Sequence, residues 1–196
     1  MERVSHRSIM TEGLVRSGFT FRERVAHDPS GTVAVIQMKD LNGGYSDIKA
    51  DGVARVTGKD IGPQHYLAKG DVLFLAKGAH NRAVVYVLDL AKAVAASAFF
   101  FLRPGPAQVD PFYLAWWINQ QPVQEYLHQN MAGNYIPNIT KPTVEGITVP
   151  LPPLDQQRLI AAMSGLAHTE QRILSELTIK RQQLVHHLHL SSINAH

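Results

Sequence analysis

The feature that most constrains this chain is a long uninterrupted stretch that follows a proline cluster near its end. Pro150, Pro152 and Pro153 remove backbone donors and disfavour helix at the residue before each of them. From Asp155 onward there is no proline and only one glycine, Gly165, so the sequence predicts a single helix with a carboxylate in its first turn. About 36 helical residues at ~1.5 Å each would make this helix roughly 55 Å long.

Apolar residues recur along this stretch at spacings of three, four and seven, which is the heptad pattern of a coiled coil. Two positions of this heptad row hold charged residues, Glu170 and Arg181. A second apolar row beside it widens the apolar face of the helix. Because a small domain cannot bury so long a face alone, we expect a partner helix. The predicted pairing residues are Ile160, Met163, Leu166, Ala167, Ile173, Leu174, Leu177, Leu184 and Leu188.

The composition is that of an ordinary globular protein. With 196 residues, 45% hydrophobic and 18% charged, the chain is predicted to hold one domain over residues 1–150 and the helix over residues 151–196. The absence of cysteine excludes disulfides, thiolate metal sites and a cysteine nucleophile. The longest apolar run, Ala93 to Leu102, is too short to span a bilayer, and the N-terminus lacks a signal-peptide core. The sequence therefore predicts a soluble, cytoplasmic protein without a membrane partner.

The net charge is +3 with a pI of about 9.2, and the basic excess lies in the front half of the chain. Residues 1–105 carry 14 Lys and Arg against 10 Asp and Glu, residues 106–153 carry one against three, and residues 154–196 carry four against three. A mild basic excess is expected of a face that binds duplex DNA, but it is also common in proteins that do not. Charge alone therefore favours a nucleic-acid partner only weakly.

The order of elements predicts an α/β (α+β) fold with a mixed or antiparallel sheet. Strands are expected at residues 33–38, 53–56, 72–76, 83–88, 94–102 and 147–149, and residues 1–18 are expected to form a short helix or a loose start. A connection of hairpin length joins the strands at 72–76 and 83–88. Asp110 and Pro111 predict an N-cap and first helical residue, and Pro122 begins a second helix that extends through Gln129.

Four polar loops are candidates for contact with DNA, since lysine and arginine suit guanine edges, asparagine suits adenine edges, and arginine also binds phosphate. Each loop also has a structural interpretation, as a solvated turn or as packing for the core or the C-terminal helix. The candidates are Lys77, His80, Asn81 and Arg82 in the hairpin connection; Thr20, Arg22 and Arg24 beside Phe21; Gln37, Lys39, Asn42 and Tyr45 with Asp40; and Asn134, Tyr135 and Lys141 with Asn138 and Thr140.

No pattern in the chain predicts a catalytic site. The run Asp110–Tyr113 differs from the Asp/Asn-Pro-Pro-Tyr/Phe motif of amino-group DNA methyltransferases at Phe112, and no glycine-rich loop follows a strand to hold a methyl donor. His186 and His189 can share one helical face, but no third metal ligand is fixed near them, and cations suit a helix C-terminus in any case. The sequence therefore predicts no enzyme activity, no cofactor and no metal.

A family resemblance covers nearly the whole chain. The run PLPPLDQQRLI, at the entry to the heptad helix, resembles the segment that follows the target-recognition domain in specificity subunits of type I restriction-modification systems. Asp155, Gln156 and Gln157 stand where that family more often shows Glu-Gln. Upstream, SGFTFR, VIQMKDL, GDVLFLAKG and DPFYLAWWINQ resemble successive landmarks of one such domain. The full-length family member has two recognition domains and two helices, so this chain resembles a half-length form.

The resemblance implies a non-catalytic subunit that reads a short half-site in double-stranded DNA. It would direct DNA methyltransferase subunits, which use S-adenosylmethionine, to that site, and restriction subunits would be further partners. Two copies joined as a homodimer through antiparallel helices would restore the full-length layout and make the target symmetric and interrupted. Two alternatives stay open: a helix-mediated assembly factor or decoy that does not read DNA, and a methyltransferase that acts alone.

Overall fold

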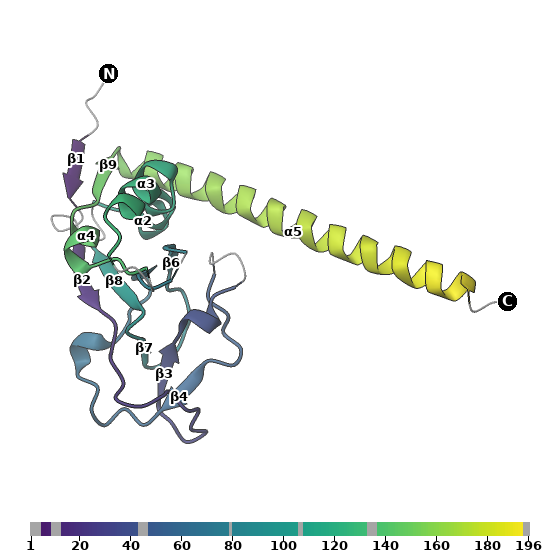
Figure 1. Cartoon of the computed structure of the whole chain (residues 1–196). Helices are drawn as coiled ribbons and strands as arrows, with labels where there is room; N and C mark the ends of the chain where they lie inside the picture. The colour runs from purple at the N-terminus through teal and green to yellow at the C-terminus, as the bar shows by residue number, and fades with distance from the viewer. Residues whose placement is uncertain are drawn as a thin grey trace. The chain divides into compact units, whose positions relative to one another are not determined.

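The computed structural model describes residues 5–8, 13–42, 47–78, 80–105, 108–132 and 137–193. The chain divides into two compact units, Met1–Arg158 and Leu159–His196. Figure 1 shows the order of the elements along the chain. They are β1 (Ser5–Ser8), β2 (Gly13–Ser17), β3 (Val33–Ile36), the 3-10 turn η1 (Met38–Asp40), β4 (Ala54–Val56), the 3-10 turn η2 (Pro63–His65), β5 (Val72–Leu75), β6 (Ala83–Val85), β7 (Ala93–Ala95), β8 (Phe99–Pro104), α2 (Pro111–Ile118), α3 (Gln121–Gln129), α4 (Lys141–Glu145), β9 (Thr148–Leu151) and α5 (Leu154–Ile193).

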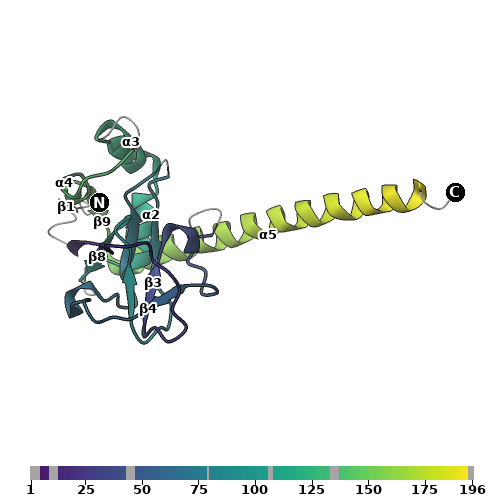
Figure 2. The ribbon, with the colours of Figure 1, turned by 60° about the horizontal axis from the view of Figure 1, so that its bottom comes forward.

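The described strands of the first unit form three sheets. Strands β2, β8, β5 and β6 lie in that order in an antiparallel sheet. In the second sheet β3 lies between β4, which is antiparallel to it, and β7, which is parallel, and β3 and β4 lie side by side in Figures 1 and 2. The third sheet pairs β1 with β9. This arrangement, followed by a long C-terminal helix, confirms the predicted α+β fold with mixed and antiparallel sheets.

Strand β5 is the centre of the hydrophobic core. All four of its residues are buried, as expected of a strand that is apolar on both faces. Its side chains Leu73 and Leu75 belong to one buried cluster with Ile36, Tyr86 and Phe101. A smaller cluster comprises Val33 and Val35 of β3, Val94 of β7 and Ile61 before η2. The residues packed against it are Phe19, Phe21, Val25, Val56, Tyr66 and Ala96.

The stretch predicted as one strand over residues 94–102 is in fact two strands of different sheets. Strand β7 ends at Ala95, a turn follows, and β8 begins at Phe99. The Phe99 N–H donates to the Ala96 carbonyl oxygen at 3.0 Å, and Gly18 passes so close that a Cβ there would collide with the same oxygen. Apart from Ser97 the stretch holds no residue type that favours a turn, so the break is not visible in the sequence.

The N-terminal segment also differs from the prediction of a short helix or a loose start. Strand β1 pairs with β9, with Ser5 opposite Leu151, and β2 pairs with β8, with Ser17 opposite Phe100. The β1 residues are serine, histidine and arginine, so this strand lacks the apolar alternation by which a strand is recognised. Its pairing with β9 joins the start of the first unit to the segment that leads into α5.

Capping groups set the starts of the helices. Asp110 is the N-cap of α2, because its Oδ1 accepts hydrogen bonds from the N–H of Phe112 at 2.9 Å and of Tyr113 at 3.1 Å. This confirms the N-cap interpretation of the Asp110–Tyr113 run. Thr140 caps α4 through the N–H of Thr143 at 3.4 Å, and this short helix was not predicted.

Gln157, in the first turn of α5, is held by hydrogen bonds within the first unit. Its side chain is 1% exposed. The Oε1 atom accepts from the Asp110 N–H at 2.9 Å, and Nε2 donates to the carbonyl oxygens of Gln108 at 3.0 Å and Pro152 at 2.8 Å. The second glutamine of the PLPPLDQQRLI run therefore has a structural role, because it ties the start of α2 to the exit from β9.

Helix α5 runs without a break from Leu154 to Ile193, which confirms the predicted single long helix (Figure 1). Its heptad row is exposed, with Met163 62%, Leu174 57%, Leu177 58% and Leu184 58% accessible. The side chain of Leu188 lies outside the described residues. Among the described residues, no helix combines the length and the apolar character needed to cross a bilayer.

Candidate nucleic-acid interface

Three of the four candidate loops meet at one end of the two larger sheets, around the turn at residues 95–99. The Ala96 N–H donates to the Ile36 carbonyl oxygen at 2.9 Å, and the Ala76 N–H donates to the Ala98 oxygen at 2.9 Å. The Ile139 N–H donates in turn to the Ala76 oxygen at 2.9 Å. The loops after β3 and β5 and the segment before α4 are therefore neighbours in space, although they are far apart in the sequence.

The hairpin connection between β5 and β6 carries two exposed cations. Gly78 has φ +100°, a conformation that side chains rarely adopt, and this lets the chain turn back. Lys77, His80 and Arg82 are exposed. The Nη1 of Arg82 also donates to the Asn119 carbonyl oxygen at 3.1 Å, which orients the guanidinium. These side chains have the chemistry for contacts with phosphates and guanine edges.

Asn81, predicted as an adenine-reading residue, faces the protein interior. It is 5% exposed, and its Nδ2 donates to the carbonyl oxygens of Leu75 at 3.0 Å and Ala76 at 3.3 Å. The main-chain oxygen of Asn81 accepts from Gln124 Nε2 at 2.9 Å. The side chain therefore bonds the end of the hairpin connection back to its start. Asn81 is not part of the interface that we propose below.

Asn119, which sequence reasoning did not single out, clamps the edge strand β6 to the end of α2. Its Oδ1 accepts from the Ala83 N–H at 2.9 Å and its Nδ2 donates to the Ala83 carbonyl oxygen at 2.8 Å. The side-chain amide thus takes the place that a neighbouring strand would occupy. The main-chain oxygen of Asn119 also accepts from Arg82, so the end of α2 contacts the hairpin connection directly. The C-terminal position of Asn119 on a predicted helix was visible in the sequence, but its partner strand was not.

We expect Asn119→Ala to lower the free energy of unfolding by about 1–3 kcal/mol, because it leaves both backbone groups of Ala83 without partners. Ala83 is 2% exposed, so water cannot easily replace them. Chemical denaturation measures the change. The control is Asn130→Ala at the end of α3, where the exposed side-chain amide bonds to the Tyr126 oxygen of its own helix, and a change within about 0.5 kcal/mol is expected there. An equally small effect at Asn119 would contradict the clamp.

The loop after β3 begins with η1, whose charged side chains interact with residues of the same turn. Asp40 is 4% exposed, its Oδ2 accepts from the Gln37 N–H at 2.8 Å, and its Oδ1 lies 3.2 Å from Lys39 Nζ. The Nε2 atom of Gln37 is buried and has no hydrogen-bond partner in the described part of the chain. Lys39 remains 58% exposed, so this cation can reach a ligand beside the domain.

The other predicted contacts of these loops are partly engaged within the protein. Asn42 Nδ2 donates to Asp47 Oδ2 at 3.1 Å. Lys141 is the first residue of α4, and its Nζ lies 3.5 Å from Glu145 Oε1. Tyr45, Asn134 and Tyr135 lie outside the described residues.

The fourth candidate loop, residues 19–26, lines a separate groove of about 590 Å³ with Val56 and Asp60. The Phe19 and Phe21 rings meet edge to face, with centroids 4.8 Å apart, and pack on the smaller core cluster. This agrees with the structural interpretation of the aromatic residues. The polar side chains of the loop are exposed, namely Thr20, Arg22 and Arg24. The structure does not bring these residues together with the hairpin connection.

Among the described residues, the ionisable groups with a displaced pKa lie outside the four candidate loops. Arg103 donates Nε and Nη2 to Asp71, each at 2.7 Å, and this pairing raises the pKa of Arg103. Hydrogen bonds from Ser30 hold the pKa of Asp28 below its ordinary value. Burial raises the pKa of Tyr86 and of Tyr113.

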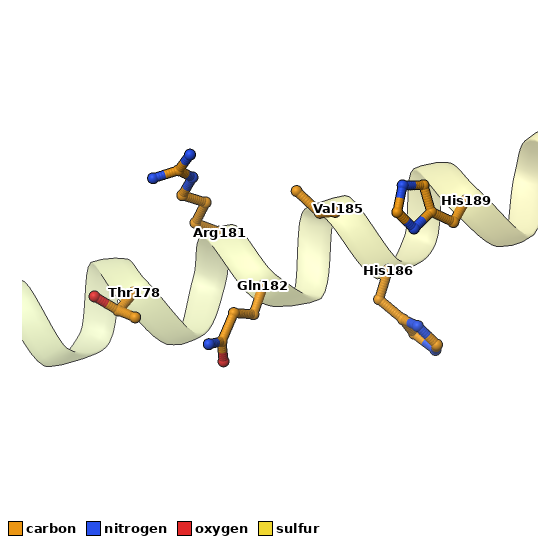
Figure 3. Close-up of a pocket in the computed structure, with 6 residues that line it drawn as sticks. All are labelled: Thr178, Arg181, Gln182, Val185, His186 and His189. Atoms are coloured by element: carbon orange, nitrogen blue, oxygen red, sulfur yellow. The ribbon is translucent and has the colours of Figure 1, made fainter.

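Within the described residues, no group of three or more potential ligand side chains is placed to bind a metal ion. The histidines near the end of α5 contribute to an exposed helix face rather than to a cluster of that kind. Figure 3 shows this face, where Arg181 and Val185 project from one side of the helix and Gln182 and His186 from another.

A comparison with known protein families identifies the family of this chain. Residues 13–178 match the family described as the type I restriction modification DNA specificity domain. The chain belongs to this type I specificity family. The match takes in β2 through β9 and extends along α5, so it covers both the specificity domain and the start of its helix. A comparison with curated proteins found no match.

Solved structures of specificity subunits share the fold. The HsdS subunit from Thermoanaerobacter tengcongensis matches with a TM-score of 0.67 at 18% identity, over 91% of this chain and 45% of that one. The S subunit from M. genitalium matches with a TM-score of 0.55 at 16% identity, over 84% and 38%. A chain from a study of complex assembly and conformational transition in a type I system matches with a TM-score of 0.66 at 16% identity, over 88% and 45%. The present specificity chain therefore spans less than half the length of each of these proteins.

Proposed function

We propose that this chain is the DNA-sequence-specificity subunit of a type I-like restriction-modification system, with no catalytic activity of its own. The observation that carries the proposal is the convergence of the loops after β3 and β5 at one turn, with Lys39, Lys77 and Arg82 exposed beside it. Stiff strands support these cations at one end of the sheets, where they can contact phosphates and read guanine edges. Membership in the specificity family supports the same function.

The proposed partners are double-stranded DNA and DNA methyltransferase subunits, which would bind S-adenosylmethionine and transfer the methyl group. In complexes that also cleave DNA, restriction subunits would join them. The chain itself would supply the position on the DNA, and the complex would act in the cytoplasm. The alternatives are an assembly factor or decoy that does not read DNA, and a methyltransferase that acts alone.

We further infer that two copies pair through the exposed heptad row of α5. Each copy would read one half-site, and the twofold symmetry of the homodimer would make the target an inverted motif with an unread gap. With 40 residues in α5, at ~1.5 Å per residue the helix is about 60 Å long. One turn of DNA is ~34 Å, so a spacer of this length can hold two half-sites more than one helical turn apart.

Charge reversal at the hairpin connection tests the reading function. We expect Lys77→Glu with Arg82→Glu to abolish methylation of the specific site, because acidic side chains repel phosphates and cannot donate to guanine. At about 1–3 kcal/mol for each of the two lost contacts, affinity for the site should fall at least about thirtyfold. Methylation is measured with the complex of this chain and its methyltransferase, and assembly of that complex by light scattering should be unchanged.

Lys69→Glu with Lys92→Glu is the matched control, because it makes the same change of charge before β5 and β7, at the opposite ends of those strands from the 95–99 turn. Methylation should persist in this control. If the Lys77 and Arg82 variant also methylates normally, the assembly factor or decoy becomes the better account. Binding of S-adenosylmethionine by the isolated chain, measured by calorimetry, would favour an independent methyltransferase, and we expect no binding.

A further inference from the structure

Two opposite charges lie within the apolar row of α5 without a counter-ion on their own helix. Glu170 and Arg181 follow the same spacing of three and four as Leu174 and Leu177. Side chains that neighbour each other on a helix surface are three or four residues apart. At those distances Glu170 has Leu166, Ala167, Ile173 and Leu174, and Arg181 has Leu177, Thr178, Leu184 and Val185. Neither charge can therefore be neutralised within its own helix.

Arg172, by contrast, has a counter-ion on the same helix. The Nη1 of Arg172 lies 2.8 Å from Glu176 Oε1, four residues further along and on the face away from the apolar row. Among the described residues, none of the ion pairs includes Glu170 or Arg181. Figure 3 shows Arg181 projecting from α5 on the same side as Val185. Unpaired charges inside an exposed apolar row indicate that a partner helix supplies the opposite charges.

A second copy of α5 supplies both opposite charges when it is antiparallel. If Leu174 faces Leu177 of the partner subunit, counting four residues outward from each places Glu170 opposite Arg181 of the partner subunit. The twofold symmetry creates the same pair a second time. In a parallel, in-register pair, Glu170 would face Glu170 of the partner subunit and Arg181 would face Arg181 of the partner subunit, so both positions would be repulsive.

Glu170 and Arg181 also favour this register over the registers that are shifted by one heptad. Sliding the helices by one heptad, ~10.5 Å, brings Glu170 opposite Leu174 or Leu188 and Arg181 opposite Met163 or Leu177. Burying a charge against an apolar side chain is unfavourable when no partner compensates it. In the paired register Arg158 faces Ile193 of the partner subunit. The part of α5 in the second compact unit is therefore paired with the partner helix along its whole described length.

We propose that Glu170 and Arg181 determine the orientation and register of the homodimer, through two symmetric Glu170–Arg181 ion pairs across an antiparallel pair of α5 helices. The inference rests on the homodimer of the proposed function and adds its register. It also gives the two charges a role in target choice, since the register fixes the separation of the two recognition domains. A slip of one heptad would change the unread gap by about three base pairs at ~3.4 Å each.

Four variants of the full chain test the register by sedimentation equilibrium. Glu170→Arg and Arg181→Glu each place like charges at both sites, and each should weaken the homodimer at least about tenfold. The double variant Glu170→Arg with Arg181→Glu restores both pairs and should dimerise as the wild type does. An equimolar mixture of the two single variants should form a heterodimer of wild-type affinity. Arg172→Glu, on the opposite face, makes the same charge change as Arg181→Glu and should leave the dimer intact.

The outcomes separate the register from the dimer itself. Single variants that dimerise as tightly as the wild type would overturn the proposed ion pairs while leaving the homodimer in place. Single variants that the mixture does not rescue would overturn them as well. A wild-type chain that stays monomeric at every concentration would overturn the homodimer, and the register with it.

Discussion

Leu174→Glu together with Leu177→Glu should reduce the solution mass of the chain from about twice 21.7 kDa to one copy. These leucines are 57% and 58% exposed on α5, and in the proposed register they form the centre of the helix pair. The substitution removes about 1.5–3 kcal/mol of burial for each side chain and brings four carboxylates together. We expect the dissociation constant to rise at least about a thousandfold, which light scattering over a concentration series measures directly.

Ile179→Glu is the matched control for this variant. Ile179 is 54% exposed on the same helix, but it lies outside the heptad row, two residues after Leu177. A charge there should leave the mass at two copies. Equal dissociation of both variants would mean that the apolar row is not the contact surface. A wild-type chain that is already monomeric would mean that the apolar row binds another protein.

Arg103→Ala should have the largest effect on stability, lowering the free energy of unfolding by about 2–4 kcal/mol. Asp71 is 1% exposed, and its carboxylate accepts both guanidinium bonds and the Ala68 N–H at 2.8 Å. Removing the arginine leaves a buried carboxylate without its cation. We place the effect below that of a fully buried pair because the Arg103 side chain is 42% exposed.

Lys69→Ala provides the comparison for Arg103→Ala, because Lys69 Nζ lies 3.2 Å from Asp89 Oδ1 with the two side chains 59% and 94% exposed. An exposed pair of this kind contributes less than about 1 kcal/mol. Chemical denaturation of both variants should therefore separate them clearly. If Arg103→Ala proved no more destabilising than Lys69→Ala, the buried pair would not stabilise the turn before β5.

The parts of the fold that were predictable from the sequence are those with local signals. The heptad row and the proline cluster defined α5, Asp110 with Pro111 defined the start of α2, and the spacing of two apolar runs defined the β5–β6 hairpin. In each of these patterns the residues concerned are close together in the sequence. Local propensity and patterning therefore sufficed.

The parts that were missed depend on partners distant in the sequence. Strand β1 is polar and exists because β9 pairs with it, and the turn at residues 95–99 is set by contacts with Gly18 and Ile36. For the same reason an asparagine in a polar loop could not be assigned from sequence alone. Asn81 bonds inward to two carbonyl oxygens, whereas Lys77, a few residues before it, is exposed. Burial, which decides between these roles, is a property of the assembled sheets.

The most direct test of the account is sequencing of methylated bases in DNA from cells that contain this chain and its methyltransferase. A symmetric specificity subunit predicts one methylated motif made of two identical, inverted halves separated by a gap of fixed length. Deleting one heptad from α5 should change that gap while leaving both halves unchanged. A contiguous motif, two different halves, or no motif with the methyltransferase present would contradict the account.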